Sequence, residues 1–261
     1  MKTFFETFAV AFSMFSRIPV RQFEWTEKNQ KYMMLAFPAV GLVLGLAWLL
    51  VAAACDELGI PSLLTGALLT ALPMLLVGGI HLDGYADTWD ALASHGDREA
   101  KLAIMKDPHT GSFAVLHLIL WFLLCFAANV TLAEQEAIHW LPVALLFVLS
   151  RALSGLAVAT FPMAADTGLV RSFADTADRK KVRNGLLFLL AVLAICFLAL
   201  DLAAETFPTG LAICAAAALV FVWYRFISEK HFGGITGDLA GWFLCRCEVW
   251  MLVAAALVAG L

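Results

Sequence analysis

Three aspartates with helical spacing stand directly after the second long apolar stretch of the chain. The segment reads GGIHLDGYADTWD over residues 78–90, and Asp83, Asp87 and Asp90 occupy positions i, i+4 and i+7. This spacing places three carboxylates on one helical face, where like charges repel and favour a compensating cation. Mg²⁺ binds carboxylate oxygens, usually one or two of them together with substrate phosphates. The segment therefore predicts phosphoryl- or prenyl-transfer chemistry. The alternative is a solvated loop helix whose acids face water.

Two further segments place charges beside glycines. The sequence IMKDPHTGSF, residues 104–113, carries Lys106 and Asp107 just before a helix start, and the free N–H groups of a helix start suit phosphate. The sequence FGGITGDLAG, residues 232–241, puts Asp238 at the edge of the last apolar stretch. The alternatives are an ordinary helix start for the first segment and a glycine-rich loop with Asp238 as a helix cap for the second.

Four other ionisable residues lie in or at the edge of apolar stretches: His81, Arg151, Arg246 and Glu248. A charge in hydrocarbon costs at least about 2.5 kcal/mol, so such residues usually face a cavity or one another. Arg151 is a candidate phosphate ligand, with a structural ion pair as the alternative. Arg246 and Glu248 could pair within the last helix, although a spacing of i, i+2 places them on different faces. His81 is a candidate to orient a ligand, with an interfacial hydrogen bond as the alternative.

The composition indicates a protein that is embedded in a lipid bilayer. The 261 residues are 62% hydrophobic and 15% charged, and their mean hydropathy is +0.87, whereas soluble proteins average roughly 45–50% apolar and 25% charged residues. The net charge of −4 offers no broad basic surface, which excludes nucleic acid as a partner and leaves membrane lipid. The six cysteines are scattered without a CxxC pair, so we expect inert thiols.

Seven stretches are long and apolar enough to cross a bilayer, which needs about 20 residues. They cover residues 32–54, 61–80, 112–132, 138–160, 185–203, 207–225 and 239–261. The segment before them, with an apolar run that Glu6 interrupts, predicts an interfacial or re-entrant helix ending at Pro19. We therefore expect an all-α polytopic membrane bundle of about seven spans, forming one domain over residues 1–261.

Lysine and arginine occur on alternate connectors. They lie in the amino-terminal segment and in the connectors at 81–111, 161–184 and 226–238, the last together with Arg225 at its edge. The intervening connectors carry acids without a basic residue: Asp56, Glu57, Glu134, Glu136, Asp201 and Glu205. Because basic residues near short loops stay in the cytosol, we expect a cytosolic amino terminus and a periplasmic carboxyl terminus. Helical spans place the protein in a bacterial inner membrane, with all three charged segments on the cytosolic face.

The amino-acid sequences of these segments, and their order in the chain, resemble one known family. GIHLDGYADT at 79–88, IMKD at 104–107 with Gly111, and GGITGD at 233–238 are similar to cobalamin synthases, the adenosylcobinamide-GDP ribazoletransferases, as are FSRIPV at 15–20 and the pair Ser150-Arg151. The resemblance runs nearly end to end. Two positions depart from the family pattern. Trp89 stands where a small or polar residue is usual, and Cys245 stands where Glu is expected, which leaves Glu248 as the candidate acid of that helix.

The resemblance implies a Mg²⁺-dependent membrane enzyme that joins adenosylcobinamide-GDP to α-ribazole, or its 5′-phosphate, and releases GMP. Asp83, Asp87 and Asp90 would hold one or two Mg²⁺ ions, Lys106 and Arg151 would neutralise charge on the leaving phosphate, and Asp107 or Asp238 would be the base. The remaining substrate contacts would be His81, Gly111, Thr236 and Gly237. A homo-oligomer or a complex with other corrinoid-assembly enzymes is an expectation at the level of the family.

Three other functions compete with this one. A CDP-alcohol phosphotransferase or a polyprenyltransferase would also set aspartates at the cytosolic ends of spans, but Asp87 stands where the arginine of DGxxAR would be, and an NxxxD opening is absent. A small-solute transporter would have its binding groups near the bilayer midplane, in internally repeated halves. Here the acids lie at one edge and no repeat is detectable.

Overall fold

The computed structural model describes residues 2–135, 140–165, 168–204 and 208–260, and every regular element in these ranges is a helix. The elements are α1 (Lys2–Phe15), α2 (Glu27–Gln30), α3 (Met33–Glu57), α4 (Ser62–Val77), α5 (Ile80–Ala93), α6 (Arg98–Ile104), α7 (Ser112–Ala133), α8 (Trp140–Thr160), α9 (Leu169–Thr176), α10 (Arg179–Ala204), α11 (Thr209–Ile227), the π-helix η2 (Ser228–Phe232) and α12 (Gly237–Ala259). The prediction of an all-α bundle is confirmed. Residues 138, 139, 207 and 261 of the predicted spans lie outside the described ranges, as do the predicted connector acids Glu136 and Glu205.

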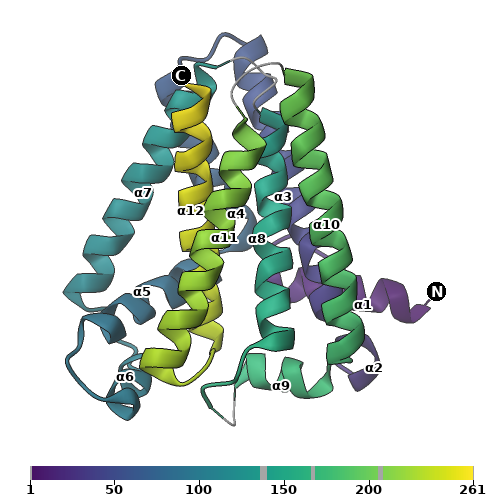
Figure 1. The fold of residues 1–261 in the computed structure, drawn as a ribbon, viewed down its shortest axis with the longest axis vertical. Helices are drawn as coiled ribbons and strands as arrows, with labels where there is room; N and C mark the ends of the chain where they lie inside the picture. The colour runs from purple at the N-terminus through teal and green to yellow at the C-terminus, as the bar shows by residue number, and fades with distance from the viewer. Residues whose placement is uncertain (1, 136–139, 166–167, 205–207, 261) are drawn as a thin grey trace.

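In the described part of the chain, six helical segments are long and apolar enough to cross a membrane: α3, α7, α8, α10, α11 continued by η2, and α12. Helices α4 and α5 pass the same test only as a pair, which brings the possible number of spans to seven, and this pair is bent by 97°. Helix α4 therefore runs with the crossing helices, while α5 turns to lie along one end of the bundle (Figure 1). The sequence predicted an unbroken stretch to residue 80.

Two glycines make this bend. Gly78 and Gly79 have φ angles of +85° and +81°, a left-handed backbone that ends α4 and starts α5. The Arg17 N–H donates to the carbonyl of Leu76 at 2.7 Å, and a Cβ at Gly78 would lie 2.6 Å from the Arg17 side chain. The chain after α1 is thus packed against the end of α4, and the bend cannot accept a larger residue without displacing it.

Helix α8 is the centre of the bundle and α10 its rim. In the most apolar stretch of α8, 89% of the residues are buried, whereas in that of α10 only 17% are buried. Gly41 and Gly45 of α3 let its backbone approach that of α8, since a Cβ at either would lie 2.1–2.2 Å from the carbonyl oxygens of Ala144 and Phe147. Most residues of α8 are therefore shielded from lipid, whereas most of α10 faces it.

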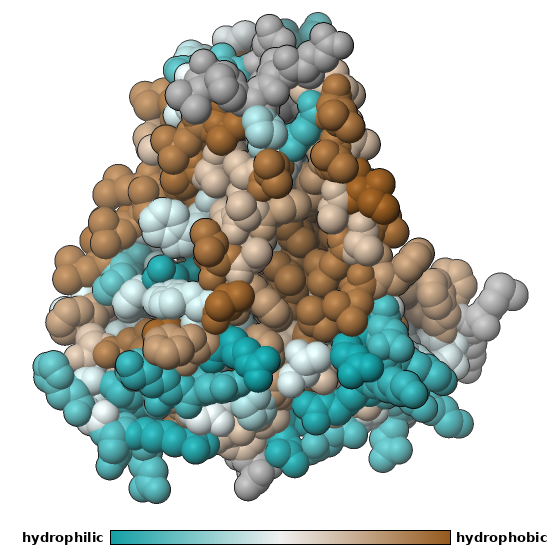
Figure 2. Space-filling model, viewed as in Figure 1, coloured by the Kyte–Doolittle hydropathy of each residue, from teal (hydrophilic) through white to brown (hydrophobic). Residues whose placement is uncertain are grey.

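One end of the bundle is polar, and an apolar belt surrounds the middle of the bundle beyond it (Figure 2). Figure 2 shows hydrophilic side chains gathered at the end where α5, α6 and α9 lie. Helix α1 lies across the bundle near this end (Figure 1), with its Phe15 ring 4.2 Å from that of Phe37. This is the orientation expected of an interfacial helix, although α1 ends at Phe15, before the predicted stop at Pro19.

Candidate active site at the polar end

Helices α5 and α12 touch through glycines, and this contact brings their acids together. A Cβ at Gly84 would lie 2.6 Å from the backbone of Asp238, and one at Gly241 would lie 3.0 Å from the carbonyl oxygen of His81. Partial burial, followed by repulsion from Asp83, Asp238 and Asp90, raises the pKa of Asp87 to about 6. The carboxylates at this contact are therefore close enough to repel one another.

Asp90, predicted as a metal ligand, has a different partner in the structure. Its Oδ2 accepts the Gly111 N–H at 2.6 Å and its Oδ1 accepts the Ala114 N–H at 2.9 Å, so both oxygens cap the start of α7. Gly111, predicted to contact substrate, directs its N–H to this carboxylate, and a Cβ there would lie 2.6 Å from it. Asp90 thus joins α5 to the start of α7, and both of its carboxylate oxygens already accept hydrogen bonds there.

Two cavities meet at Asp238. The first, of about 200 Å³, is lined by His81, Asp83 and Asp238 and walled by the aromatic rings of Phe15, Phe37 and Phe173. The second, of about 250 Å³, is lined by Lys106, Arg171, Thr236, Gly237 and Asp238. Val170, Gly237 and Asp238 line both. An apolar compartment and a basic one therefore share a carboxylate at their boundary.

The glycine-rich segment before α12 is held against the chain that follows α8. Ile235 and Met163 form an isolated parallel bridge, with the Ile235 N–H donating to Pro162 at 2.8 Å. A Cβ at Gly234 would lie 2.5 Å from Met163, so only glycine allows this contact. Thr236 caps α12 by accepting the Leu239 N–H at 3.2 Å. By contrast, a Cβ at Gly237 would meet only Val170, at 3.9 Å, so packing within the protein leaves room there for a ligand.

The two candidate bases differ in position. Asp238 is half-buried and lines both cavities. Asp107 lines neither; its Oδ1 accepts the His109 N–H at 2.9 Å and lies 2.7 Å from the His109 ring, and these hydrogen bonds lower the pKa of Asp107. A carboxylate with a lowered pKa is a weaker base. The geometry therefore favours Asp238.

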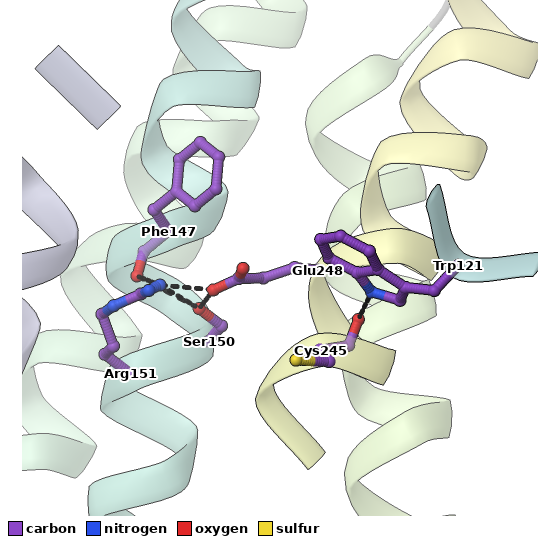
Figure 3. Close-up of polar contacts among 6 residues, drawn as sticks. All are labelled: Trp121, Phe147, Ser150, Arg151, Cys245 and Glu248. Atoms are coloured by element: carbon purple, nitrogen blue, oxygen red, sulfur yellow. Dashed lines mark hydrogen bonds and ion pairs between the residues drawn. The ribbon is translucent and has the colours of Figure 1, made fainter. Parts of the chain in front are cut away.

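Arg151 pairs with Glu248 in the interior of the bundle. Figure 3 shows Arg151 and Ser150 of α8 directed at the Glu248 carboxylate of α12. Arg151 is 1% exposed; its Nη1 contacts Glu248 Oε1 and donates to the Phe147 carbonyl at 3.0 Å, while the Ser150 hydroxyl donates to the same Oε1 at 2.9 Å. Of the two roles considered for Arg151, the structure contains the ion pair. The residue borders a recess of about 30 Å³ beside His81, apart from the two larger cavities.

Both departures from the family pattern lie near α12. Cys245 is buried, and its carbonyl accepts the Trp121 indole N–H at 2.9 Å (Figure 3). Trp89 packs against Arg246, whose Cζ lies 5.2 Å from the ring centroid. Arg246 therefore interacts with aromatic rings, while Glu248 pairs with Arg151. Trp89 also stacks on His117, with ring centroids 3.6 Å apart.

Sequence reasoning missed the contribution of α9. Arg171 and Phe173 line the basic and apolar cavities respectively, but the sequence used residues 161–184 only as a basic connector. The amphipathic pattern of LVRSFADT, with Val170 and Phe173 three apart, was the available signal.

These observations define a class: a polytopic helical membrane protein with an acidic and basic site at the polar end of its bundle. Residues 7–256 match the family model described as cobalamin-5-phosphate synthase. The chain belongs to this family, as the resemblance in the sequence predicted. No solved structure matches the chain.

Three curated relatives carry the name adenosylcobinamide-GDP ribazoletransferase. The protein of Lachnoclostridium phytofermentans is 39% identical over 252 residues, which cover 96% of this chain and 93% of the relative. That of Pseudomonas fluorescens is 40% identical over 226 residues, covering 86% and 87%. That of Clostridium perfringens is 30% identical over 254 residues, covering 95% and 96%. The family model, over residues 7–256, spans all three charged segments.

Proposed function

We propose that the protein transfers the phosphocobinamide part of adenosylcobinamide-GDP to α-ribazole or its 5′-phosphate. A ribose hydroxyl of α-ribazole attacks the β-phosphorus of the GDP group, the bond from that phosphorus to the bridging oxygen breaks, and GMP leaves. The product is adenosylcobalamin or its phosphate. The observation that carries the proposal, beside the family, is the junction of an aromatic and a basic cavity at Asp238.

Each cavity suits one part of this reaction. The cavity walled by Phe15, Phe37 and Phe173 offers flat apolar surface to the benzimidazole base of α-ribazole. The cavity with Lys106 offers positive charge to the diphosphate, and Gly237 leaves space for a phosphate oxygen near the start of α12. The hydroxyl and the phosphorus would therefore meet beside Asp238, which accepts the hydroxyl proton.

We propose that acids of α5 bind a Mg²⁺ ion whose remaining positions are filled by water and substrate. Within the described ranges, no group of three or more His, Cys, Asp or Glu side chains is placed to hold a metal. Mg²⁺ nevertheless usually takes one or two carboxylates and fills its other positions with water and phosphate oxygens. Asp83 and Asp87 would hold it, and the bound ion would offset the charge of the diphosphate. Lys106 would stabilise the charge that develops on departing GMP.

The family match favours ribazole transfer over the CDP-alcohol phosphotransferase, polyprenyltransferase and transporter alternatives. We propose that the polar end of the bundle faces the cytosol of a bacterial inner membrane, where nucleotide substrates are dissolved. The amino terminus is then cytosolic and the carboxyl terminus periplasmic. A homo-oligomer or a complex with other corrinoid-assembly enzymes remains a prediction.

The test uses the purified full chain in detergent with Mg²⁺, adenosylcobinamide-GDP and α-ribazole, and measures cobalamin and GMP. Equimolar products are expected, and their absence from a preparation that melts cooperatively contradicts the function. Asp83→Asn should lower the rate about 100-fold, because a metal contact is worth several kcal/mol and 1.36 kcal/mol is tenfold. Asp56→Asn, an exposed acid at the far end of α3, is the matched control and should retain the rate.

A further inference from the structure

A groove separate from both cavities runs along the outer surface of α11 and α12. Its volume is about 360 Å³, and it is lined by Leu219, Trp223, Arg246, Trp250 and Leu257 among others. Leu219 and Leu257 are 74% and 67% exposed, so the groove opens toward lipid. It shares no lining residue with the cavities that meet at Asp238.

One cation stands in this apolar groove. The Cζ of Arg246 lies 4.0 Å from the ring centroid of Trp223, 5.2 Å from that of Trp89 and 5.4 Å from that of Trp242. Its Nε has no hydrogen-bond partner, and no Asp or Glu of the described ranges forms an ion pair with it. Aromatic faces attract a guanidinium but leave its charge uncompensated. The groove therefore has a binding position for an anion.

The cation lies toward the polar end of the groove. Side chains on a helix point back toward its amino terminus, and the Arg246 guanidinium is close to Trp242, one turn nearer that end. From Arg246 to Leu257 the helix rises about 16 Å, close to half of a hydrocarbon core roughly 30 Å thick. The groove is thus charged at one end, apolar along the rest, and about one leaflet long.

We propose that this groove binds one anionic glycerophospholipid of the leaflet at the polar end of the bundle. The phosphate contacts Arg246, and one acyl chain lies along Leu219, Trp250 and Leu257. An anionic lipid matches the groove better than a helix of a second copy does. The lipid carries its charge at one end of an apolar chain, and the groove has its cation at one end of an apolar surface. The inference is independent of the reaction proposed above.

Native mass spectrometry of the delipidated full chain, titrated with phosphatidylglycerol or phosphatidylcholine, tests the proposal. One phosphatidylglycerol should bind at least about tenfold more tightly than phosphatidylcholine. Arg246→Gln should abolish this preference. Arg225→Gln, which removes an exposed arginine of the same helix pair that is already paired with Glu229, is the matched control and should keep it.

A second variant keeps the cation and fills the groove. Ala254→Trp retains Arg246 but occupies the path of the acyl chain, so phosphatidylglycerol binding should weaken about tenfold or more. Equal binding of the two lipids by the unmodified protein overturns the proposal, as does unchanged selectivity in Arg246→Gln. A dimer without bound lipid that Ala254→Trp dissociates would show that a second copy occupies the groove.

Discussion

Replacing Glu248 by alanine leaves the Arg151 guanidinium without its counter-charge. Arg151 is 1% exposed and lies on α8, the most buried helix. Removing one partner of a buried ion pair costs about 3–5 kcal/mol, and each kcal/mol lowers the Tm of a chain of this size by about 2–4 °C, so the expected loss is about 6–20 °C. The assay is thermal unfolding of the full chain in detergent. A Glu248→Ala variant with the same Tm as the unmodified protein would refute the assignment of this ion pair.

The double variant Arg151→Met/Glu248→Leu separates the two roles considered for Arg151. Because apolar residues of similar volume can replace a buried ion pair at little cost, its Tm should return to within a few degrees of the unmodified protein. Ribazole transfer should also be retained, since Glu248 already neutralises Arg151 and the residue lines neither large cavity. A stable double variant without activity would instead assign Arg151 to substrate phosphate.

Three further predictions concern the polar end. Asp238→Asn should lower the transfer rate about 100-fold or more while Asp107→Asn retains most of it, and equal effects in a steady-state assay would contradict the choice of base. Asp90→Ala should lower the free energy of unfolding by about 0.5–2 kcal/mol through loss of the α7 cap, and Gly111→Ala should also destabilise, which paired melts measure. The raised pKa of Asp87 means that the folded chain binds more protons than the unfolded chain between about pH 4 and 6, so stability without Mg²⁺ falls as pH rises through this window. Asp87→Asn should remove that fall in Tm, and an unchanged pH profile would count against the crowding of these carboxylates.

The spans could be predicted because hydrophobic length is a local property of the sequence. The bend at Gly78 and Gly79 was missed because the apolar window was followed through both residues, although a Gly–Gly pair is itself a turn signal. A count of hydrophobic residues therefore located the second apolar stretch. It did not show that the following helix, α5, lies along the polar end.

The placement of candidate site residues could be predicted where a single helix decides it, but not where a contact joins helices that are far apart in the chain. Asp83 and Asp87 could be placed on one face of α5 from spacing alone. Asp90 shares that spacing, but its partner is the start of α7, 21 positions further along the chain. Likewise Glu248 lies 97 positions from Arg151, so the sequence showed two buried charges without showing that they meet.

The Arg151–Glu248 pair also bears on the order in which the protein is assembled. The ribosome completes α8 well before α12, so at the translocon the arginine precedes the only acid with which the structure pairs it. Until α12 has been synthesised, α8 carries an unneutralised cation, although α8 is the most buried of the crossing helices in the folded protein. We therefore expect α8 to be held stably in the membrane only after α12 has been synthesised and Glu248 can pair with Arg151.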